Sequence, residues 1–456
     1  MPKNDLRTLS AREKQDLLKK ILKKRTTEGT TPASPKPEAA ASSAPEPAEE
    51  TWRIEKFPAY QQLLVQRAVA KHVGVDSPFF ALHEGIAGAT TSVGGRQLIN
   101  FATYNYLGLN GDPRVIAAAK QALDDYGVSA SASRVVSGER PPHRDLEQAL
   151  AALHGTEDCI AFVSGHATNV STIGCLMGSK DLIVHDRLIH NSALQGALLS
   201  GAARLSFAHN DMDALEQILI ERRASHEKVL IVVEGVYSMD GDICPLDRLV
   251  ELRHRYRTLL MVDEAHSLGV LGRTGRGVGE HFGIDGADVD LWMGTLSKTL
   301  SGCGGYIAGS RALVELLKFT APGFVYSVGM PPVIAAAAKA SLDCMLAEPE
   351  RVERLRANGK LFTDMARARG LDVGLSQGLN IVPVITGRSV LAAKLSNALM
   401  DRGINAAPII YPAVEERAAR LRFFLSSEHT EEQLRTTVDV TAEELTRLQD
   451  AEEDKG

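Results

Sequence analysis

Short apolar runs alternate with amphipathic segments along the middle of the chain. The runs have the length of β-strands and are apolar at consecutive positions rather than at every second one. Such strands are buried on both faces, which is typical of a mostly parallel sheet covered by helices. The segments between them carry apolar residues three and four positions apart, as helices do. The predicted strands are 160–163, 182–184, 229–233, 259–262, 291–293 and 306–308, and the predicted helices are 114–126, 144–154, 212–223 and 247–256.

The pattern changes after about residue 330. An alanine-rich segment at 333–346 and a charged one at 350–368 have the length of long helices. Shorter strands are predicted at 381–385 and 407–411. We therefore expect an α/β fold in two parts. The expected order is an N-terminal segment (51–100), a large domain with a mostly parallel sheet (101–330) and a smaller α+β C-terminal domain (331–450).

The first fifty residues have a different composition. Residues 1–25 are strongly basic and carry an apolar stripe at helical spacing. Residues 26–50 are rich in Pro, Ala, Ser, Thr and Glu, a composition that cannot bury a core and predicts a disordered linker. The basic segment is therefore either a docking helix on a tether or a solvated tail.

Charge and cysteine content narrow the class of protein. The net charge of −6 makes nucleic acid an unsuitable partner for the body of the chain. No apolar run is long enough for a membrane span, and no signal-peptide core opens the sequence. The five cysteines form no C-x-x-C pair, so we expect a reduced, cytoplasmic protein without a structural metal.

Two of the buried runs end in chemically distinctive residues. Asp263 directly follows the run 259–262 with His266 three positions later, and the run 291–293 leads to Lys298. The carboxyl ends of neighbouring parallel strands meet at one edge of a sheet, so these side chains are expected in one crevice. This set suits pyridoxal 5′-phosphate (PLP): Lys298 for a Schiff base, Asp263 for the pyridine nitrogen and His266 for O3′.

The tetrapeptide Asp-Glu-Ala-His at 263–266 has a second interpretation, because it also occurs in nucleic-acid helicases. Those proteins need a G-x-x-x-x-G-K-[ST] phosphate loop, and this chain has none. The helicase interpretation is therefore set aside.

Further polar residues follow the other predicted strands. The small-residue turn 164–169 leads into a helix and predicts a phosphate cradle. His190 lies in the loop after 182–184, where a ring could stack on a cofactor, although a lone histidine is more often structural. Ser238 follows 229–233 within reach of the same crevice. Arg422, expected at a helix-to-strand turn, is either a clamp for a substrate carboxylate or a surface ion pair.

Taken together, these motifs resemble the α-oxoamine synthases, a family of PLP enzymes. The resemblance runs from about residue 55 to about residue 445. It implies the PLP-dependent transferase fold type I and a homodimer with active sites at the interface. The implied reaction is a decarboxylative Claisen condensation of an amino acid with an acyl thioester, giving an α-amino ketone, CO2 and a free thiol. The motifs that match are 105–109, 133–138, 143–147, 164–165, 186–192, 234–242, 263–267, 294–298 and 420–422.

The resemblance also implies roles for single residues. Lys298, His190, Asp263 and His266 are the expected catalytic residues. The expected substrate-binding residues are Asn105, Ser133, Arg134, His143 and Arg422. The residues expected to contact PLP are Ser164, Gly165, His166, His190, Ser238, Asp263, His266, Thr295, Ser297, Lys298 and Ser327.

Two positions depart from the family's pattern. A hydroxyl residue that reaches the neighbouring subunit's phosphate is replaced by Val328, so Ser327 or a backbone N–H must serve. Glycine-specific members have Thr where this chain has Ser133, which favours alanine or serine over glycine as the amino acid.

The acyl donor is either a CoA thioester or a carrier-bound thioester. Residues 1–25 look like the short helices near module boundaries of polyketide and non-ribosomal peptide synthetases, and carrier proteins are generally acidic. We therefore hypothesise that this segment recruits an acyl carrier protein. Transamination, aldol cleavage and a PLP-sensing regulator are the rival functions; such regulators carry a folded DNA-binding domain, for which 25 helical residues are too few.

Overall fold

The computed structural model describes residues 47–453, which fall into two compact units with a boundary after Arg67. The described part of the first unit holds two short 3-10 helices, Glu49–Thr51 and Ile54–Lys56, and the start of α2 (Pro58–His72). The predicted basic helix at 1–25 and residues 26–46 of the predicted linker lie outside the described residues. The second unit, residues 68–456, contains all the sheets.

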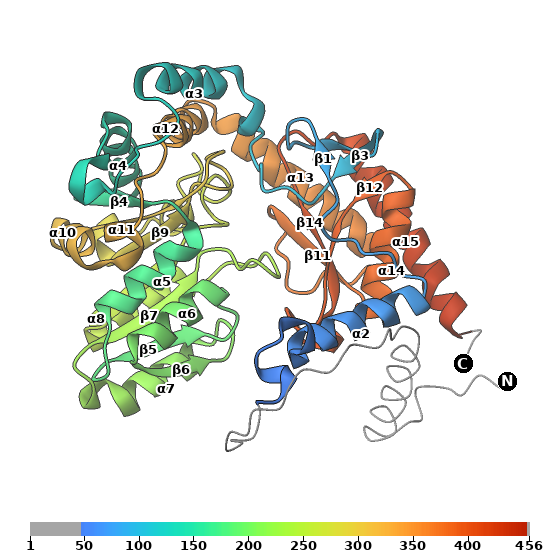
Figure 1. Ribbon diagram of the computed structural model, residues 1–456, viewed down its shortest axis with the longest axis horizontal. Helices are drawn as coiled ribbons and strands as arrows, with labels where there is room; N and C mark the ends of the chain where they lie inside the picture. The colour runs from blue at the N-terminus through green and yellow to red at the C-terminus, as the bar shows by residue number, and fades with distance from the viewer. Residues whose placement is uncertain (1–46, 454–456) are drawn as a thin grey trace, which may run out of the picture. The chain divides into compact units, whose positions relative to one another are not determined.

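The largest sheet of the second unit has seven strands, several of which are labelled at the left of Figure 1. Strands β9, β8, β7, β5 and β6 run parallel to one another, whereas β10 is antiparallel to both β9 and β4. All six strands expected from the apolar runs are present, so the mostly parallel sheet is confirmed. In sheet order the strands are β4 (Asp158–Phe162), β10 (Gly305–Gly309), β9 (Leu291–Thr295), β8 (Leu259–Asp263), β7 (Val229–Glu234), β5 (Leu182–Asp186) and β6 (Ala203–Phe207).

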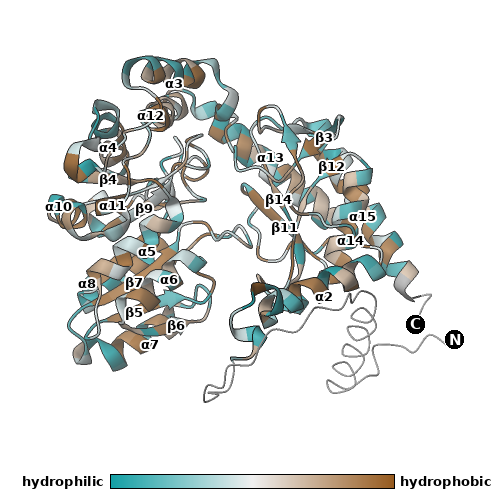
Figure 2. Cartoon of the chain, in the orientation of Figure 1, coloured by the Kyte–Doolittle hydropathy of each residue, from teal (hydrophilic) through white to brown (hydrophobic). Residues whose placement is uncertain are grey.

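Both faces of this sheet are covered, as the continuous apolar runs predicted. In β7, Val229, Ile231 and Val233 pack into one core cluster, while Leu230 and Val232 pack into another. The first cluster includes side chains of α4, α7, α8 and α12, and the second those of α5, α6 and α10. Strands β5 and β7 accordingly take the hydrophobic colour in Figure 2. The helices are α3 (Pro113–Tyr126), α4 (Pro141–His154), α5 (Gly165–Leu176), α6 (Asn191–Ser200), α7 (Met212–Arg222), α8 (Leu246–Tyr256), α10 (Arg311–Thr320) and α12 (Pro332–Ala347).

Two smaller sheets complete the unit. An antiparallel sheet has the order β11 (Ile381–Ile385), β14 (Arg420–Phe424) and β13 (Ala407–Ile409). A second sheet joins β1 (His83–Glu84), β2 (Thr90–Val93) and β3 (Arg96–Asn100) to β12 (Ile404–Asn405). The remaining elements are α9 (Val278–Phe282), α11 (Pro322–Val325), α13 (Pro349–Ala368), α14 (Ser389–Asp401), α15 (Glu431–Glu453), the π-helix Arg134–Gly138, and 3-10 turns at Leu109–Gly111, Arg223–Ser225, Gly286–Asp288 and Glu416–Ala418.

The segment 420–423 was expected at a helix-to-strand turn, and this is wrong, because Arg420–Phe424 is a paired strand between β11 and β13. The pairing of β12 with β3 also ties the segment around residues 83–100 to C-terminal elements. The division into domains at residue 330 stays a prediction.

No helix among residues 47–453 is long and apolar enough to cross a membrane. Within the same residues, no group of three or more His, Cys, Asp or Glu side chains is arranged to hold a metal ion.

Candidate active site

A cavity lies at the carboxyl ends of β7, β8 and β9, where the apolar runs give way to polar side chains. Residue pairing between β7 and β8 sets Glu234 opposite Asp263, and β9 ends at Thr295, three positions before Lys298. The cavity has a volume of ≈ 230 Å³. Its lining residues are Ser164, Gly165, His166, Asn169, His190, Ser192, Glu234, Asp263, Ala265, His266, Met293, Thr295, Ser297 and Lys298.

Asp263 is held by hydrogen bonds that favour its carboxylate form. Its Oδ2 accepts from the Asn169 side-chain amide at 3.0 Å, and its Oδ1 accepts from the Ala265 backbone amide at 3.0 Å. The same Asn169 amide also donates to Ser192 Oγ at 2.9 Å. The Asp263 carboxylate is therefore buried and oriented from two sides, and it forms no ion pair with any residue among 47–453.

His190 is oriented from the other end of that network. Its Nδ1 lies 2.7 Å from Ser192 Oγ and accepts from the Ser192 backbone amide at 3.2 Å. Burial lowers the pKa of His190, so the ring is neutral with its proton on Nε2. A neutral ring held in one orientation is suited to stacking on a planar ligand.

His266 is held by two aromatic residues. Tyr106 Oη lies 2.8 Å from His266 Nδ1, and the Phe424 ring is nearly parallel to the imidazole at a centroid distance of 6.3 Å. Burial, followed by the charges of Lys298 and Arg422, lowers the pKa of His266 well below its usual range. With the phenol donating to Nδ1, the neutral ring keeps its N–H at Nε2.

Lys298 is half-buried, and its Nζ lies 5.5 Å from the centre of the Tyr104 ring. Burial lowers the pKa of its ammonium to about 8, assisted by the charge of Arg422 and opposed by Asp263 and Glu234. An amine with this pKa is readily deprotonated near neutral pH, which a nucleophile or a base requires.

A group of hydrogen-bonding residues lies at the start of α5. Ser164 is the N-cap of this helix, with its Oγ accepting from the Ala167 backbone amide at 3.3 Å. A Cβ at Gly165 would lie 3.0 Å from Thr295 Oγ1, a tight contact, so glycine lets the helix approach that hydroxyl closely. Ser297 Oγ accepts from the Gly304 amide at 3.2 Å. A helix N-terminus with hydroxyls beside it is a binding site for a phosphate group.

The residues present fit PLP. The cavity offers a carboxylate for a protonated pyridine nitrogen, an amine of lowered pKa for an aldehyde and an anion site for a phosphate. Two buried oxygens that line it, Asn169 Oδ1 and Glu234 Oε1, have no hydrogen-bond partner among the described residues. Unpaired buried oxygens are costly in an empty protein and are expected where a polar ligand binds.

Arg422 lies beside the cavity without lining it. The guanidinium donates from Nη1 to the Ser238 carbonyl at 2.7 Å and lies 4.5 Å from the centre of the Phe424 ring. Its Nε is buried without a partner in the described part of the chain. Because its charge lowers the pKa of both Lys298 and His266, Arg422 is close to the reacting groups.

Ser238 and Ser327 are not brought into the cavity, although both were expected to contact PLP. Ser238 is buried, with its backbone amide donating to Glu234 Oε2 at 3.1 Å. Ser327 is partly exposed, and its hydroxyl donates to the Val328 carbonyl at 3.3 Å. Their contacts with the cofactor stay predictions.

Four expected substrate residues also lie outside the cavity. Arg134 is buried between Glu147, at 2.5 Å, and Glu139, at 2.6 Å. Buried His143 lies with Nε2 2.6 Å from the Met330 carbonyl. Asn105 donates to the Ala87 carbonyl at 3.0 Å, and Ser133 precedes the π-helix as its N-cap. These contacts are structural, and binding of substrate by these four residues stays a prediction.

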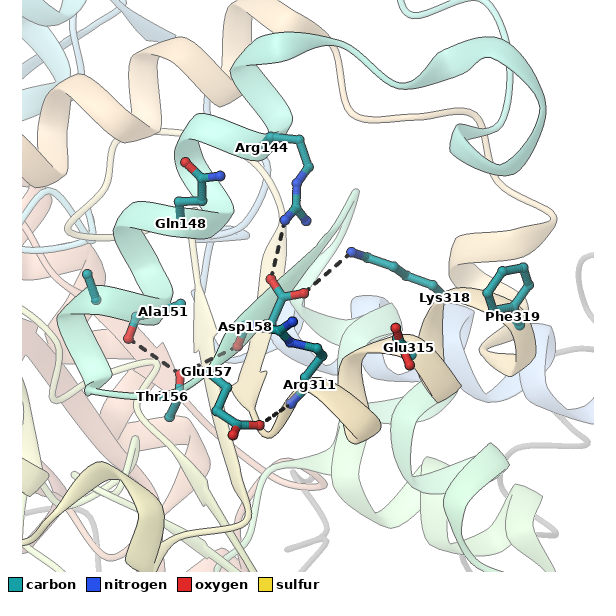
Figure 3. A pocket seen from close by; sticks show the side chains of 11 residues that line it. Arg144, Gln148, Ala151, Thr156, Glu157, Asp158, Arg311, Glu315, Lys318 and Phe319 are labelled. Atoms are coloured by element: carbon teal, nitrogen blue, oxygen red, sulfur yellow. Dashed lines mark hydrogen bonds and ion pairs between the residues drawn. The ribbon is translucent and has the colours of Figure 1, made fainter.

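A larger pocket, of ≈ 680 Å³, lies elsewhere, between α4, β4 and α10 (Figure 3). Three of its charged side chains are paired: Asp158 lies 3.6 Å from Arg144 and 3.8 Å from Lys318. Glu157 accepts from the Arg311 backbone amide at 2.8 Å. No residue expected to take part in chemistry lines this pocket.

The cavity also contains residues that the motifs did not single out. Glu234 ends an apolar run in a carboxyl, the same signal that identified Asp263, and begins the matching motif 234–242, but no role was predicted for it. Asn169 lies in the turn 164–169, which predicted a phosphate site, but no role was predicted for Asn169 itself. Tyr106 Oη reaches His266 across 160 positions of sequence, and no local pattern indicates such a contact.

Comparisons with known proteins agree with this geometry. The family model described as aminotransferase class I and II matches residues 96–441. The 8-amino-7-oxononanoate synthase 1 of Bacillus velezensis is 38% identical over 362 residues, which cover 79% of this chain and 92% of the relative. The 8-amino-7-oxononanoate synthase of Symbiobacterium thermophilum is 41% identical over 342 residues, 75% of this chain and 87% of the relative.

Among solved structures, a serine palmitoyltransferase from S. paucimobilis with bound PLP and myriocin superposes with a TM-score of 0.82. The two chains are 30% identical, and the match covers 87% of this chain and 99% of the other.

Proposed function

Because the chain belongs to the class I and II aminotransferase family, and within it to the α-oxoamine synthases, we propose that it joins an amino acid to an acyl thioester with loss of CO2. The products are an α-amino ketone and a free thiol. The observation that carries the proposal is the single cavity shared by Lys298, Asp263, His190 and His266. The family, the PLP-dependent transferase fold type I and the use of PLP, all expected from sequence motifs, are confirmed.

When bound, PLP supplies an electron sink for negative charge that develops at the amino acid Cα. Lys298 Nζ accepts the proton from that Cα, since its lowered pKa leaves the amine available near neutral pH. Asp263, held by Asn169 and the Ala265 amide, supplies the negative charge that keeps the cofactor's ring nitrogen protonated. His190, which lines the cavity, would stack on the cofactor's ring and orient it.

Arg422 is the proposed clamp for the amino acid carboxylate. Its side chain is buried and its pKa lowered, mainly by burial, so a carboxylate that reaches it gains a strong charge-assisted hydrogen bond. The unpaired Nε supports this role, because the present bonds leave that donor unused in the described chain. Release of CO2 then removes the group that Arg422 holds.

The choice of substrates is a finer proposal. Ser133 favours alanine or serine over glycine, and names of relatives and structural neighbours include both 8-amino-7-oxononanoate synthase and serine palmitoyltransferase. We propose that residues 1–25 bind an acidic acyl carrier protein, so that the donor is carrier-bound rather than CoA-bound.

A homodimer is part of the proposal. Val135, Val136, Tyr326 and Val328 are large apolar side chains that stay exposed in the single chain, at 48%, 80%, 87% and 52%. Neighbouring exposed apolar residues mark protein interfaces. A second copy on this surface would bring Ser327 toward the partner's cofactor. We place the enzyme in the cytoplasm because its five cysteines are unpaired.

Mass spectrometry of products tests the proposal. The full chain with PLP is offered a panel of amino acids, each with acyl-CoA and with acyl carrier protein. We expect α-amino ketones from alanine or serine, with faster turnover of the carrier-bound donor at sub-saturating concentration. Unchanged turnover of that donor after deletion of residues 1–50 would exclude carrier recruitment. Keto acid formed without a thioester would identify a transaminase instead.

A further inference from the structure

Glu234 is a second carboxyl in the catalytic cavity, and the mechanism above gives it no role. It ends β7 directly beside Asp263 on β8 and lines the same cavity. The residue is 2% exposed. Its Oε2 accepts from the Ser238 backbone amide at 3.1 Å, whereas its Oε1 is buried without a hydrogen-bond partner in the described chain.

Two neighbouring buried carboxyls in one cavity cannot both be charged at little cost. Asp263 has two hydrogen-bond donors on its oxygens, which favour its carboxylate. Glu234 has one within hydrogen-bond distance, with the His190 backbone amide facing it from farther away, and no ion pair between it and a described residue offsets its burial. The proton therefore resides on Glu234, and Oε1, the oxygen without a partner, is the atom that carries it.

We infer that Glu234 is a neutral carboxylic acid that donates a hydrogen bond from Oε1 to an oxygen acceptor of the cofactor bound in this cavity. The two carboxyl groups thus have different roles: Asp263 supplies negative charge, and Glu234 supplies a hydrogen-bond donor. A neutral acid beside a charged one is a recurring way to place both kinds of group in one site.

Electrostatics agree with this geometry. Burial, followed by the charge of Asp263, raises the pKa of Glu234 to about 8, against the opposing effects of the Ser238 amide and Lys298. The other groups that face this carboxyl are the His190 backbone amide, Arg422 on β14 and the buried Tyr237 phenol. The O–H donor of Glu234 is therefore present at neutral pH and is lost as the pH rises through about 8.

The inference rests on the proposed PLP site, and its test separates the two ideas. PLP retained by the full-length holoenzyme is measured by absorbance after equilibrium dialysis, from about pH 6 to about pH 10. Wild-type retention should fall above about pH 8 by up to about tenfold per pH unit, as loss of one linked proton requires. Glu234→Gln keeps an N–H donor and cannot ionise, so this alkaline fall should disappear.

Glu234→Ala removes the donor and should weaken PLP retention about tenfold or more at neutral pH, while Glu234→Gln should stay within about threefold of wild type. If Glu234→Gln and Glu234→Ala weaken retention equally, or if the alkaline fall persists in Glu234→Gln, the inference is wrong. A wild-type protein that retains no PLP at any pH would instead refute the cofactor site itself.

A measurement on the wild-type protein keeps the inference testable if the variants do not fold. Infrared spectra of the protein labelled with ¹³C-glutamate report protonated carboxyls directly. Glu264 is a second buried carboxyl with a raised pKa, of about 7, but it does not line the cavity. Removal of PLP should shift one protonated-carboxyl band, and the absence of any such shift would overturn the inference.

Discussion

Asn169 is the side chain whose removal tests the cavity's network most sharply. Its Nδ2 donates to the Asp263 carboxylate at 3.0 Å and to Ser192 Oγ at 2.9 Å, and so joins the acid to the loop that carries His190. Asn169→Ala leaves Asp263 with the Ala265 amide alone. The resulting carboxylate is less well oriented and more costly to keep charged.

The magnitude follows from the kind of bond that is lost. A hydrogen bond to a charged, buried group contributes about 1.5–3 kcal/mol, and about 1.4 kcal/mol corresponds to a tenfold change. We therefore expect Asn169→Ala to weaken PLP retention and to lower kcat/KM by about 10-fold to 150-fold. The assays are equilibrium dialysis of PLP and initial rates of thiol release.

A matched control separates this effect from general loss of stability. Asn358 also donates from Nδ2 to two acceptors, the Ser426 and His429 carbonyls, each at 2.9 Å, and lies outside the cavity. Asn358→Ala should lower the free energy of unfolding about as much as Asn169→Ala does, and it should leave PLP retention unchanged. If both variants lose PLP equally, or if Asn169→Ala retains full kcat/KM, the reasoning about the Asp263 network is refuted.

Three other outcomes are expected. Arg134→Ala removes the buried guanidinium from Glu147 and leaves it only the partly exposed Arg144, at 2.9 Å, as an ion-pair partner. Urea unfolding should therefore show a loss of about 3 kcal/mol, and a loss below about 1 kcal/mol would contradict the buried ion pair. Tyr106→Phe removes the donor to His266 Nδ1, so kcat should fall about fivefold to tenfold while the circular dichroism spectrum stays unchanged. An unaltered kcat would show that Tyr106 does not orient the His266 ring. Between about pH 8 and pH 10.5, the cofactor-free folded chain binds fewer protons at Lys298 than the unfolded chain does, so the free energy of unfolding should rise with pH. In Lys298→Met this rise should disappear. A rise that persists in the variant would show that another group causes it.

The sheet and the main chemical groups were predictable because both depend on local pattern and on one rule of topology. Runs such as 229–233 are buried on both faces and therefore apolar throughout. Because the carboxyl ends of adjacent parallel strands lie at one edge of the sheet, the sequence alone predicts that Asp263 lies near Lys298. Strand β6 was not predicted because its sequence, Ala203–Phe207, contains two polar residues in five positions and is mostly exposed.

The remaining features depend on partners that are distant in sequence. Arg134 resembled a substrate ligand, but its guanidinium is occupied by Glu147, 13 positions away. The imidazole of His143 is likewise taken by the Met330 carbonyl, 187 positions away. Such contacts arise from packing between elements, which no residue spacing encodes. Glu234 is different, because the apolar run that it ends carried the same signal as that of Asp263.

The central claim is that this cavity performs a decarboxylative condensation through Lys298, and the stoichiometry of the products tests it most directly. The full chain with PLP, alanine or serine and an acyl thioester should release CO2 and free thiol in equal amounts, and Lys298→Ala should release neither. Thiol release without CO2, keto acid in place of an α-amino ketone, or undiminished turnover in Lys298→Ala would contradict the account.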